Sequence, residues 1–161
     1  MRHRQRHVHA MILQHVRECL IASGWVNAPV NFTATPVSFL DYQPQEVGET
    51  PAFNTVAVSM GNQGADEAFE LGGGLSACSY AVFVDIYGES APLGVAIGDD
   101  VKGCLTDESI ALRDFTVEAA GLETDAQIEF ESVVVETIPT ATTTLDKRSW
   151  RSVKTTAVVF F

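Results

Sequence analysis

The feature that most constrains the fold of this sequence is a strand pattern that leads directly into a helix pattern. From Ser76 to Tyr87, residues with high β-propensity alternate between two faces, which predicts a central β-strand. Ser90 followed by Pro92 is typical of a helix N-cap with proline in the first turn, and the helix pattern then extends to about Leu105. Three glycines inside this helix weaken it by up to about 1 kcal/mol each relative to alanine, so we expect it to depend on packing against a sheet.

A second helix is predicted near the N-terminus. Apolar residues from Val8 to Leu20 recur at three- and four-residue steps and form one stripe, and Gly24 is placed to end the helix. The opposite face carries Arg6 and Arg17, so this helix should pack on one side only.

Further strands are predicted by other alternating segments. Gly61 to Gly64 predicts a turn, after which Glu67 to Leu71 would form a return strand. The chain ends in Val-Val-Phe-Phe, and this last strand must be paired and covered because an exposed apolar edge would favour aggregation. The predicted strands are Phe53 to Met60, Ile110 to Val117, Gln127 to Ile138 and Trp150 to Phe161.

The remaining segments predict irregular structure. Pro29 to Pro51 holds four prolines and should form an extended surface arm, whereas Pro139 to Asp146 is a threonine-rich loop. With 161 residues, the chain predicts a single α+β domain spanning residues 1–161, with residues 1–6 as a flexible basic terminus. We expect a central, mostly antiparallel sheet packed by the N-terminal and mid-chain helices.

Composition excludes several classes. Hydrophobic residues make up 46% and charged residues 19% of the chain, which is typical of a folded globular protein. No apolar run approaches the roughly 20 residues of a membrane-spanning helix. The basic start lacks the uncharged core and cleavage site of a signal peptide, so we expect a cytosolic product with no membrane association.

The net charge of −11 is unevenly distributed along the chain. All 21 acidic residues lie between Glu18 and Asp146, a stretch in which Lys102 and Arg113 are the only Lys or Arg residues. An acidic body repels nucleic acid, so no specific nucleic-acid binding is expected. The other Lys and Arg residues lie toward the two ends of the chain. An acidic body with basic ends favours head-to-tail packing of subunits or docking on an oppositely charged partner, although acids retained for solubility would give a similar composition.

Candidate catalytic groups are sparse. The cysteines Cys19, Cys78 and Cys104 are odd in number, widely spaced and apolar in context, which predicts buried, reduced side chains. His3 and His7 have helical spacing, but no cysteine or carboxylate accompanies them in this segment, so we expect an exposed, frayed N-terminus rather than a metal site. Residues 72–74 are three glycines without the Lys-Ser/Thr of a phosphate loop. We therefore predict no catalytic, cofactor-binding or metal-binding residue and no enzyme activity.

This order of elements resembles the tail terminator, or tail completion, proteins of long-tailed bacteriophages. Three segments carry the likeness, which covers most of the chain although its motifs are degenerate. The leading helix runs into Gly24-Trp25, the strand from Tyr80 to Glu89 precedes the helix from Leu93 to Leu105, and the closing strand runs from Trp150 to Phe161. The proline-rich arm and the threonine-rich loop depart most from the family.

The resemblance implies a structural virion protein in the tail or neck, assembled in the host cytoplasm. Such a protein would form a ring, expected to be a hexamer, that caps the tail tube, ends its polymerisation and joins the tail to the head. Implied partners are copies of itself, the major tail tube protein and the head-completion or stopper protein, with the tape measure protein as a further candidate. DNA would pass through an acidic lumen without specific binding.

Interface positions are not fixed by a family motif, so candidates come from the charges of this sequence. The candidate interaction residues are Arg2, Arg4, Arg6, Asp41, Glu46, Glu49, Asp99, Asp100, Lys147, Arg148 and Arg151.

Alternative functions are a head–tail connector or stopper, a tail-tube subunit, a connector that touches DNA through its basic ends, and a small enzyme or ligand-binding domain.

Overall fold

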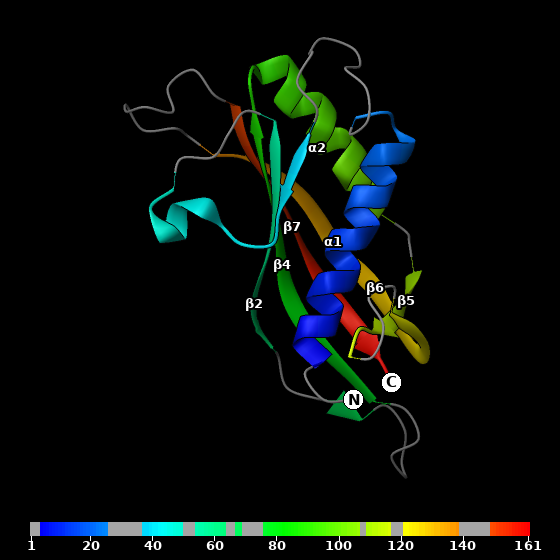
Figure 1. The fold of residues 1–161 in the computed structure, drawn as a ribbon. Helices are drawn as coiled ribbons and strands as arrows, with labels where there is room; N and C mark the ends of the chain where they lie inside the picture. Colours follow the sequence, from blue (N-terminus) through cyan, green and yellow to red (C-terminus); the bar gives the residue numbers. More distant parts are fainter. Residues whose placement is uncertain are drawn as a thin grey trace.

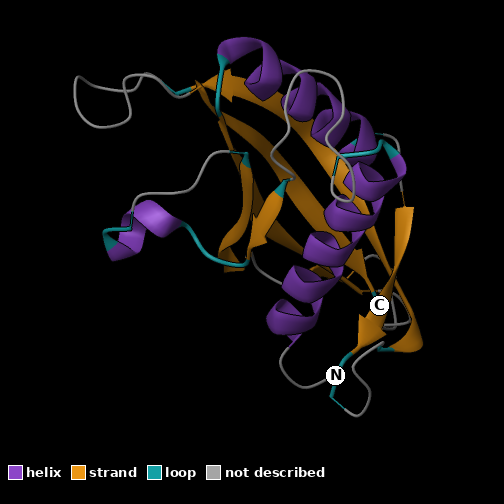
Figure 2. Ribbon diagram, turned by 45° about the horizontal axis from the view of Figure 1, so that its top comes forward, coloured by secondary structure: helices purple, strands orange, loops and turns teal. Residues whose placement is uncertain are grey.

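Two helices lie side by side on one face of a curved β-sheet, which confirms the predicted α+β class (Figure 1, Figure 2). This computed structural model describes residues 4–25, 37–49, 54–63, 67–68, 76–106, 109–116, 121–138 and 149–161. The helices are α1 (Arg4–Ala22) and α2 (Ala91–Leu105), with a short 3-10 helix η1 (Pro44–Val47). The strands are β1 (Ser38–Leu40), β2 (Thr55–Gln63), β3 (Glu67–Ala68), β4 (Ser76–Gly88), β5 (Ser109–Asp114), β6 (Leu122–Thr137) and β7 (Ser149–Phe160).

The sheet is antiparallel except at one edge. Its order among the described strands is β1-β2-β4-β7-β6-β5, with β3 also paired to β4, and only β1 joins its neighbour β2 in parallel. The C-terminal strand β7 lies between β4 and β6. Its pairing with β4 extends from Ala77↔Phe160 to Gly88↔Ser149. The predicted requirement that the Val-Val-Phe-Phe terminus be paired is confirmed, since both edges of β7 are occupied.

The residues predicted to end the first helix and to begin the second occupy those positions in the structure. Gly24 has a φ of 87°, its N–H donates to the Ile21 carbonyl, and the Trp25 N–H donates to the Leu20 carbonyl. These two bonds form a Schellman motif, which ends α1 at a residue where glycine avoids a Cβ clash. Ser90 occupies the N-cap of α2 with extended backbone angles, although its side chain makes no capping hydrogen bond.

The core lies between the helices and the sheet. On β4, Val82, Val84 and Ile86 are fully buried beneath the helices, whereas Ala81 on the other face is exposed. The predicted apolar stripes of both helices are buried against this face, and the buried apolar residues form one cluster. Burial of these stripes offsets the low helix propensity of the glycines in α2.

Several predicted boundaries need correction. Gly61 to Gln63 continue β2 instead of forming a turn, because this stretch pairs with β4 across an irregularity between Met60 and Gln63. β3 is not a return strand: both β2 and β3 are antiparallel to β4, so β3 runs in the same direction as β2 along one edge. β6 begins at Leu122, earlier than predicted, because polar residues alternate with buried ones from Thr124 onward.

The proline-rich arm is only partly extended. Its described portion contains β1 and then the helical turn η1, so the extended conformation predicted for this part is wrong at Pro44–Val47. The first part of the arm, the triple glycine and the threonine-rich loop lie outside the described residues.

The prediction of three reduced cysteines is wrong for two of them. A disulfide joins Cys19 of α1 to Cys104 of α2, while Cys78 is free and buried as expected. An odd count at wide spacing does not exclude one pair when two helices pack side by side. The bond ties together the two helices that cover the sheet.

Candidate interaction surfaces

The helices α1 and α2 pack on one face of the sheet, and neither of them covers the opposite face (Figure 2). It is partly apolar, since Val134 is 51% exposed and Phe83, Val158 and Phe160 are partly exposed. Lys154 of β7 and Glu136 of β6 form an ion pair of 2.5 Å across this face. A mixture of exposed apolar and charged side chains on a regular sheet is suited to protein contact.

A buried polar network fastens the segment from Asp41 to Glu49 to one end of that open face. The Asp85 side chain of β4 is 4% exposed and accepts hydrogen bonds from Gln43 Nε2 at 2.7 Å and Trp150 Nε1 at 3.2 Å. The Tyr87 hydroxyl donates to Gln43 Oε1, and the rings of Tyr87 and Trp150 stack at 5.5 Å. These bonds satisfy a carboxylate that would be costly to bury alone.

The sequence pattern does not predict this network. The available signal was an acidic residue, Asp85, inside an otherwise apolar strand pattern, but its partners come from distant segments. Their convergence depends on the sheet order, which periodicity does not give.

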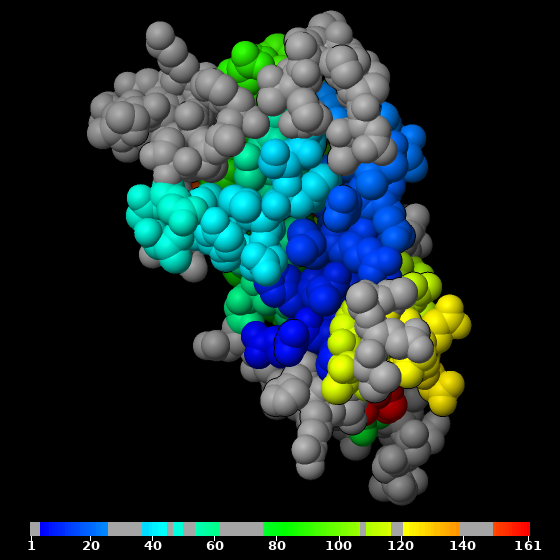
Figure 3. Space-filling view, viewed as in Figure 1, coloured from blue at the N-terminus to red at the C-terminus, as the bar shows by residue number. Residues whose placement is uncertain are grey.

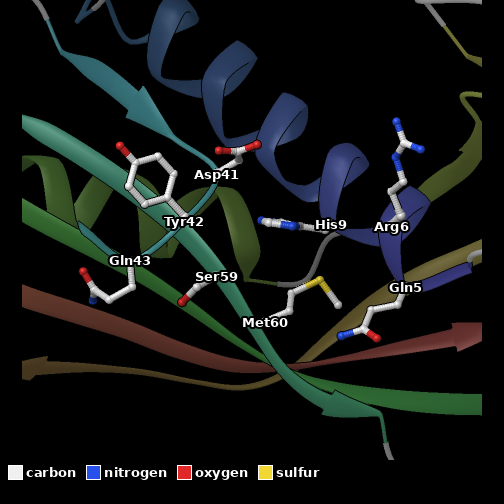
Figure 4. A pocket seen from close by; sticks show the side chains of 8 residues that line it. All are labelled: Gln5, Arg6, His9, Asp41, Tyr42, Gln43, Ser59 and Met60. Atoms are coloured by element: carbon white, nitrogen blue, oxygen red, sulfur yellow. The ribbon is translucent and has the colours of Figure 1, made fainter. Parts of the chain in front are cut away.

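A groove of about 570 Å³ separates the N-terminal half of α1 from the edge of β2 (Figure 4). The strand β1 pairs only with Thr55 to Ala57, so the outer edge of β2 beyond this point has no strand beside it among the described residues. His9 extends from α1 toward β2 and its Nε2 donates to the Val58 carbonyl at 2.8 Å. The groove is lined by Gln5, Arg6, His9, Asp41, Tyr42, Gln43, Ser59 and Met60.

A second hollow of about 580 Å³ lies between the C-terminal half of α1 and β1. Its wall from β1 is Phe39, and Ile21 of α1 is 36% exposed beside it. In Figure 3 the surface of α1 lies next to the segment that contains β1 and η1, and both are open to solvent on this side. The lining of this hollow is Ala10, Leu13, Gln14, Arg17, Glu18, Ile21 and Phe39.

Three histidines of α1 bind backbone groups, so the exposed and frayed position predicted for His7 is wrong. His7 is 3% exposed and its Nδ1 accepts a hydrogen bond from the Phe115 N–H at 3.1 Å. His9 binds β2 as described above. His15 Nε2 donates to the Cys104 carbonyl at 2.8 Å, and its ring stacks on Phe130 at 6.3 Å. These histidines therefore bind backbone groups of β2, of α2 and of the turn after β5, which an apolar stripe alone does not predict.

The predicted basic interaction residues fall in different environments. Arg6 is exposed, whereas Arg4 lies over the Phe161 ring at 3.4 Å and donates to Cys78 Sγ. Arg151 is partly buried and donates to Thr137 Oγ1 at 2.9 Å. Arg2, Lys147 and Arg148 lie outside the described residues.

The predicted acidic interaction residues also divide between free and bound side chains. Asp41 and Asp99 are exposed, and Glu49 is exposed but accepts a hydrogen bond from the Tyr42 hydroxyl at 2.7 Å. Asp100 accepts a 2.6 Å bond from the indole N–H of Trp25, so it ties α2 to the end of α1. The side chain of Glu46, in η1, is not among those described. The structure places Asp41 and Arg6 on the same groove but does not gather the predicted set into one patch.

Two ionisable groups have shifted pKa values. The hydrogen bond to Glu49 raises the pKa of Tyr42 above its usual 10.0, with burial and the charges of Glu49 and Asp41 acting in the same direction. Hydrogen bonds from the Thr116 side chain and backbone lower the pKa of Asp114 below 3.8, and His7 adds a smaller effect. Both groups are at the surface and neither belongs to a cluster of converging acids and bases.

Searches of the described residues give no metal or membrane signal. No group of three or more His, Cys, Asp or Glu residues in this part of the chain is arranged to hold a metal ion. None of the helices that the structure describes is long and apolar enough to cross a bilayer. No protein-family model matches the sequence, and a search of curated proteins finds no similar sequence.

Proposed function

We propose that this chain is a structural virion protein, the tail terminator of a long-tailed bacteriophage. It would form a ring of copies, expected to be a hexamer, that caps the tail tube, ends its polymerisation and joins the tail to the neck. The observation that carries the proposal is the sheet face opposite the helices, where β6 and β7 present exposed apolar and charged side chains instead of a helix layer. A surface of this kind is suited to assembly with other protein chains.

The arrangement of polar groups also supports assembly over catalysis. An active site is expected as a cleft in which several polar or titratable groups converge. The buried side chains of Asp85 and His7 instead bind other side chains or the backbone. The resemblance in element order, from the leading helix to the closing strand, supports a terminator over other assembly proteins.

The closest alternatives in the same class are a head–tail connector or stopper and a tail-tube subunit. Two helices covering a whole face of the sheet favour a terminator over a tube subunit, for which a more fully β fold is expected. Terminator and stopper differ in the surface to which they bind. The distinction therefore needs a tail tube as the probe.

The test is negative-stain imaging of the purified protein mixed with polymerising tail tube protein from the same phage. A terminator gives tubes that end in a ring of added density, and tube length decreases as its concentration increases. Rings that do not bind the tubes would favour the stopper over the terminator. Incorporation of the chain along the tube wall would favour a tube subunit over the terminator.

A further inference from the structure

A row of carboxylates follows β6 along the open face of the sheet. Asp125, Glu129 and Glu131 are exposed, while Ala126, Ile128 and Phe130 between them are buried toward the helices. No Lys or Arg side chain of the described residues forms an ion pair with these three carboxylates, in contrast to Glu123 and Glu136, which face Arg113 and Lys154. We call Asp125, Glu129 and Glu131 the acidic row.

An apolar strip borders the acidic row on β7. The register places Val158 opposite Glu129 and Phe160 opposite Gln127, and both apolar side chains are partly exposed on the same face. Directly opposed residues of an antiparallel pair have Cβ atoms about 4.5–5.5 Å apart, so the row and the strip form one continuous surface. A partner that fits this surface needs cations beside apolar groups.

The exposed side of α1 has this composition. Arg6, Ala10, Leu13 and Arg17 recur at steps of four, three and four residues, which aligns them on one ridge of the helix. Both arginines are exposed, and neither is in an ion pair among the described residues, whereas Ala10 and Leu13 between them are partly exposed. We call these four residues the basic ridge.

The charges on the two surfaces have comparable spacings. Arg6 and Arg17 are eleven positions apart in the helix, which corresponds to about 16.5 Å along the axis. On β6, Asp125 lies about 14 Å from Glu129 and about 20 Å from Glu131 at the usual rise per strand residue. The two arginines of the basic ridge, with Ala10 and Leu13 between them, can therefore face two carboxylates of the acidic row beside the apolar strip.

The ridge and the row lie on opposite sides of the sheet, because α1 packs on one face and the acidic row points from the other (Figure 2). They cannot meet within one copy. We propose that the basic ridge of one copy docks on the acidic row and apolar strip of the next copy, which is a head-to-tail contact between copies of this chain. Repetition of such a contact closes a ring when the rotation between copies allows it.

This inference rests on the proposed function for its ring, but it assigns the two contacting surfaces independently. The test uses two charge reversals, Glu129→Arg on the row and Arg17→Glu on the ridge. Each places like charges across the contact, so association of either variant alone should weaken roughly tenfold or more, measured by sedimentation velocity over a concentration series. The matched controls are Glu89→Arg and Lys102→Glu, which make the same charge changes at exposed positions outside both surfaces and should assemble as wild type.

Recombination of the variants tests the pairing itself. A chain carrying both reversals again places opposite charges across every contact, so its assembly should recover. A mixture of the two single variants does the same when the two variants alternate, so the mixture should also assemble. Circular dichroism and urea unfolding of each variant separate loss of contact from loss of fold. Wild-type association should also weaken between 0.1 M and 1 M salt, where the screening length falls from about 10 Å to about 3 Å.

Three results would overturn the inference, and they differ in what they say about function. If wild type assembles and folded Glu129→Arg and Arg17→Glu variants assemble equally well, the assigned surfaces are wrong while the ring remains. If each variant is impaired but the combined reversal does not recover, the residues do not face each other. If wild type is monomeric throughout, both the contact and the proposed ring fail.

Discussion

Replacing both Cys19 and Cys104 by serine should lower the free energy of unfolding, because it removes the cross-link between α1 and α2. The two cysteines are 85 residues apart in the sequence, and the bond therefore closes a long loop in the unfolded chain. A cross-link of this kind stabilises mainly by reducing the conformational entropy of the unfolded state. The prediction tests whether the two helices are joined as the structure shows.

The loop length sets the expected magnitude. For a closed loop of 85 residues, the chain-entropy relation gives about 4.6 kcal/mol at 25 °C as an upper value, and measured disulfides commonly give about 2–4 kcal/mol. We therefore expect a loss of about 3 kcal/mol. For a domain of this size, that loss lowers the melting temperature by roughly 6–12 °C.

Urea unfolding followed by tryptophan fluorescence measures this loss, in the presence and absence of a reductant. Reduction of the wild type leaves the packing of both side chains nearly intact and should reproduce most of the effect of the double serine variant. The double serine variant is the control for the reductant, since its unfolding midpoint should not respond. Mass spectrometry after alkylation counts the free thiols before each measurement.

The reasoning is refuted if oxidised wild type and its reduced form unfold at the same urea concentration while thiol counting confirms that the bond has been broken. It is also refuted if the native protein, purified without reductant, alkylates at Cys19 and Cys104 once unfolded. The first result would mean that the cross-link does not restrict the unfolded chain. The second would mean that the bond is not formed.

Three further predictions concern single contacts. Asp100→Ala leaves the indole N–H of Trp25 without its partner, and this side chain is only 2% exposed. We expect the free energy of unfolding in urea to fall by about 1–3 kcal/mol, and an unchanged value would exclude this bond. Gly24→Ala places a Cβ at a φ of 87° and should cost about 1 kcal/mol in the same assay, whereas a neutral result would argue against the Schellman turn. Because the pKa of Asp114 is lowered in the folded state, its stabilising contribution is present above its usual pKa of 3.8 and is lost as pH falls below that value. Asp114→Asn should therefore reduce the loss of stability between neutral and acidic pH, and an unchanged pH profile would contradict this.

The elements were predictable where periodicity is long and strong. The stripe from Val8 to Leu20, the strand from Ser76 to Tyr87 and the helix that follows Ser90 are all present close to their predicted bounds. These patterns record which side of each element is buried, and that information is local. The same patterns gave the α+β class, because two amphipathic helices and several alternating strands require one shared core.

The sheet order and the polar contacts were not predictable in this way. Nothing local indicates that β7 lies between β4 and β6, and the Asp85 network and the disulfide both depend on elements that are distant in sequence. His7 was misassigned because its ring accepts a hydrogen bond from the backbone of Phe115, which is distant in sequence. The candidate interaction residues were chosen from charge alone, and charge does not distinguish Arg6, which is exposed, from Arg4, which lies on Phe161.

The most direct test of the central claim, that this chain acts by assembling with itself into a ring, is its molar mass in solution by light scattering coupled to size exclusion. The ring predicts a defined species several times the mass of the 17.4 kDa chain, and a hexamer predicts about 104 kDa, six times the chain mass. That mass should be held over a range of concentrations. A mass of one chain at every concentration, for protein that circular dichroism shows to be folded, would contradict the account.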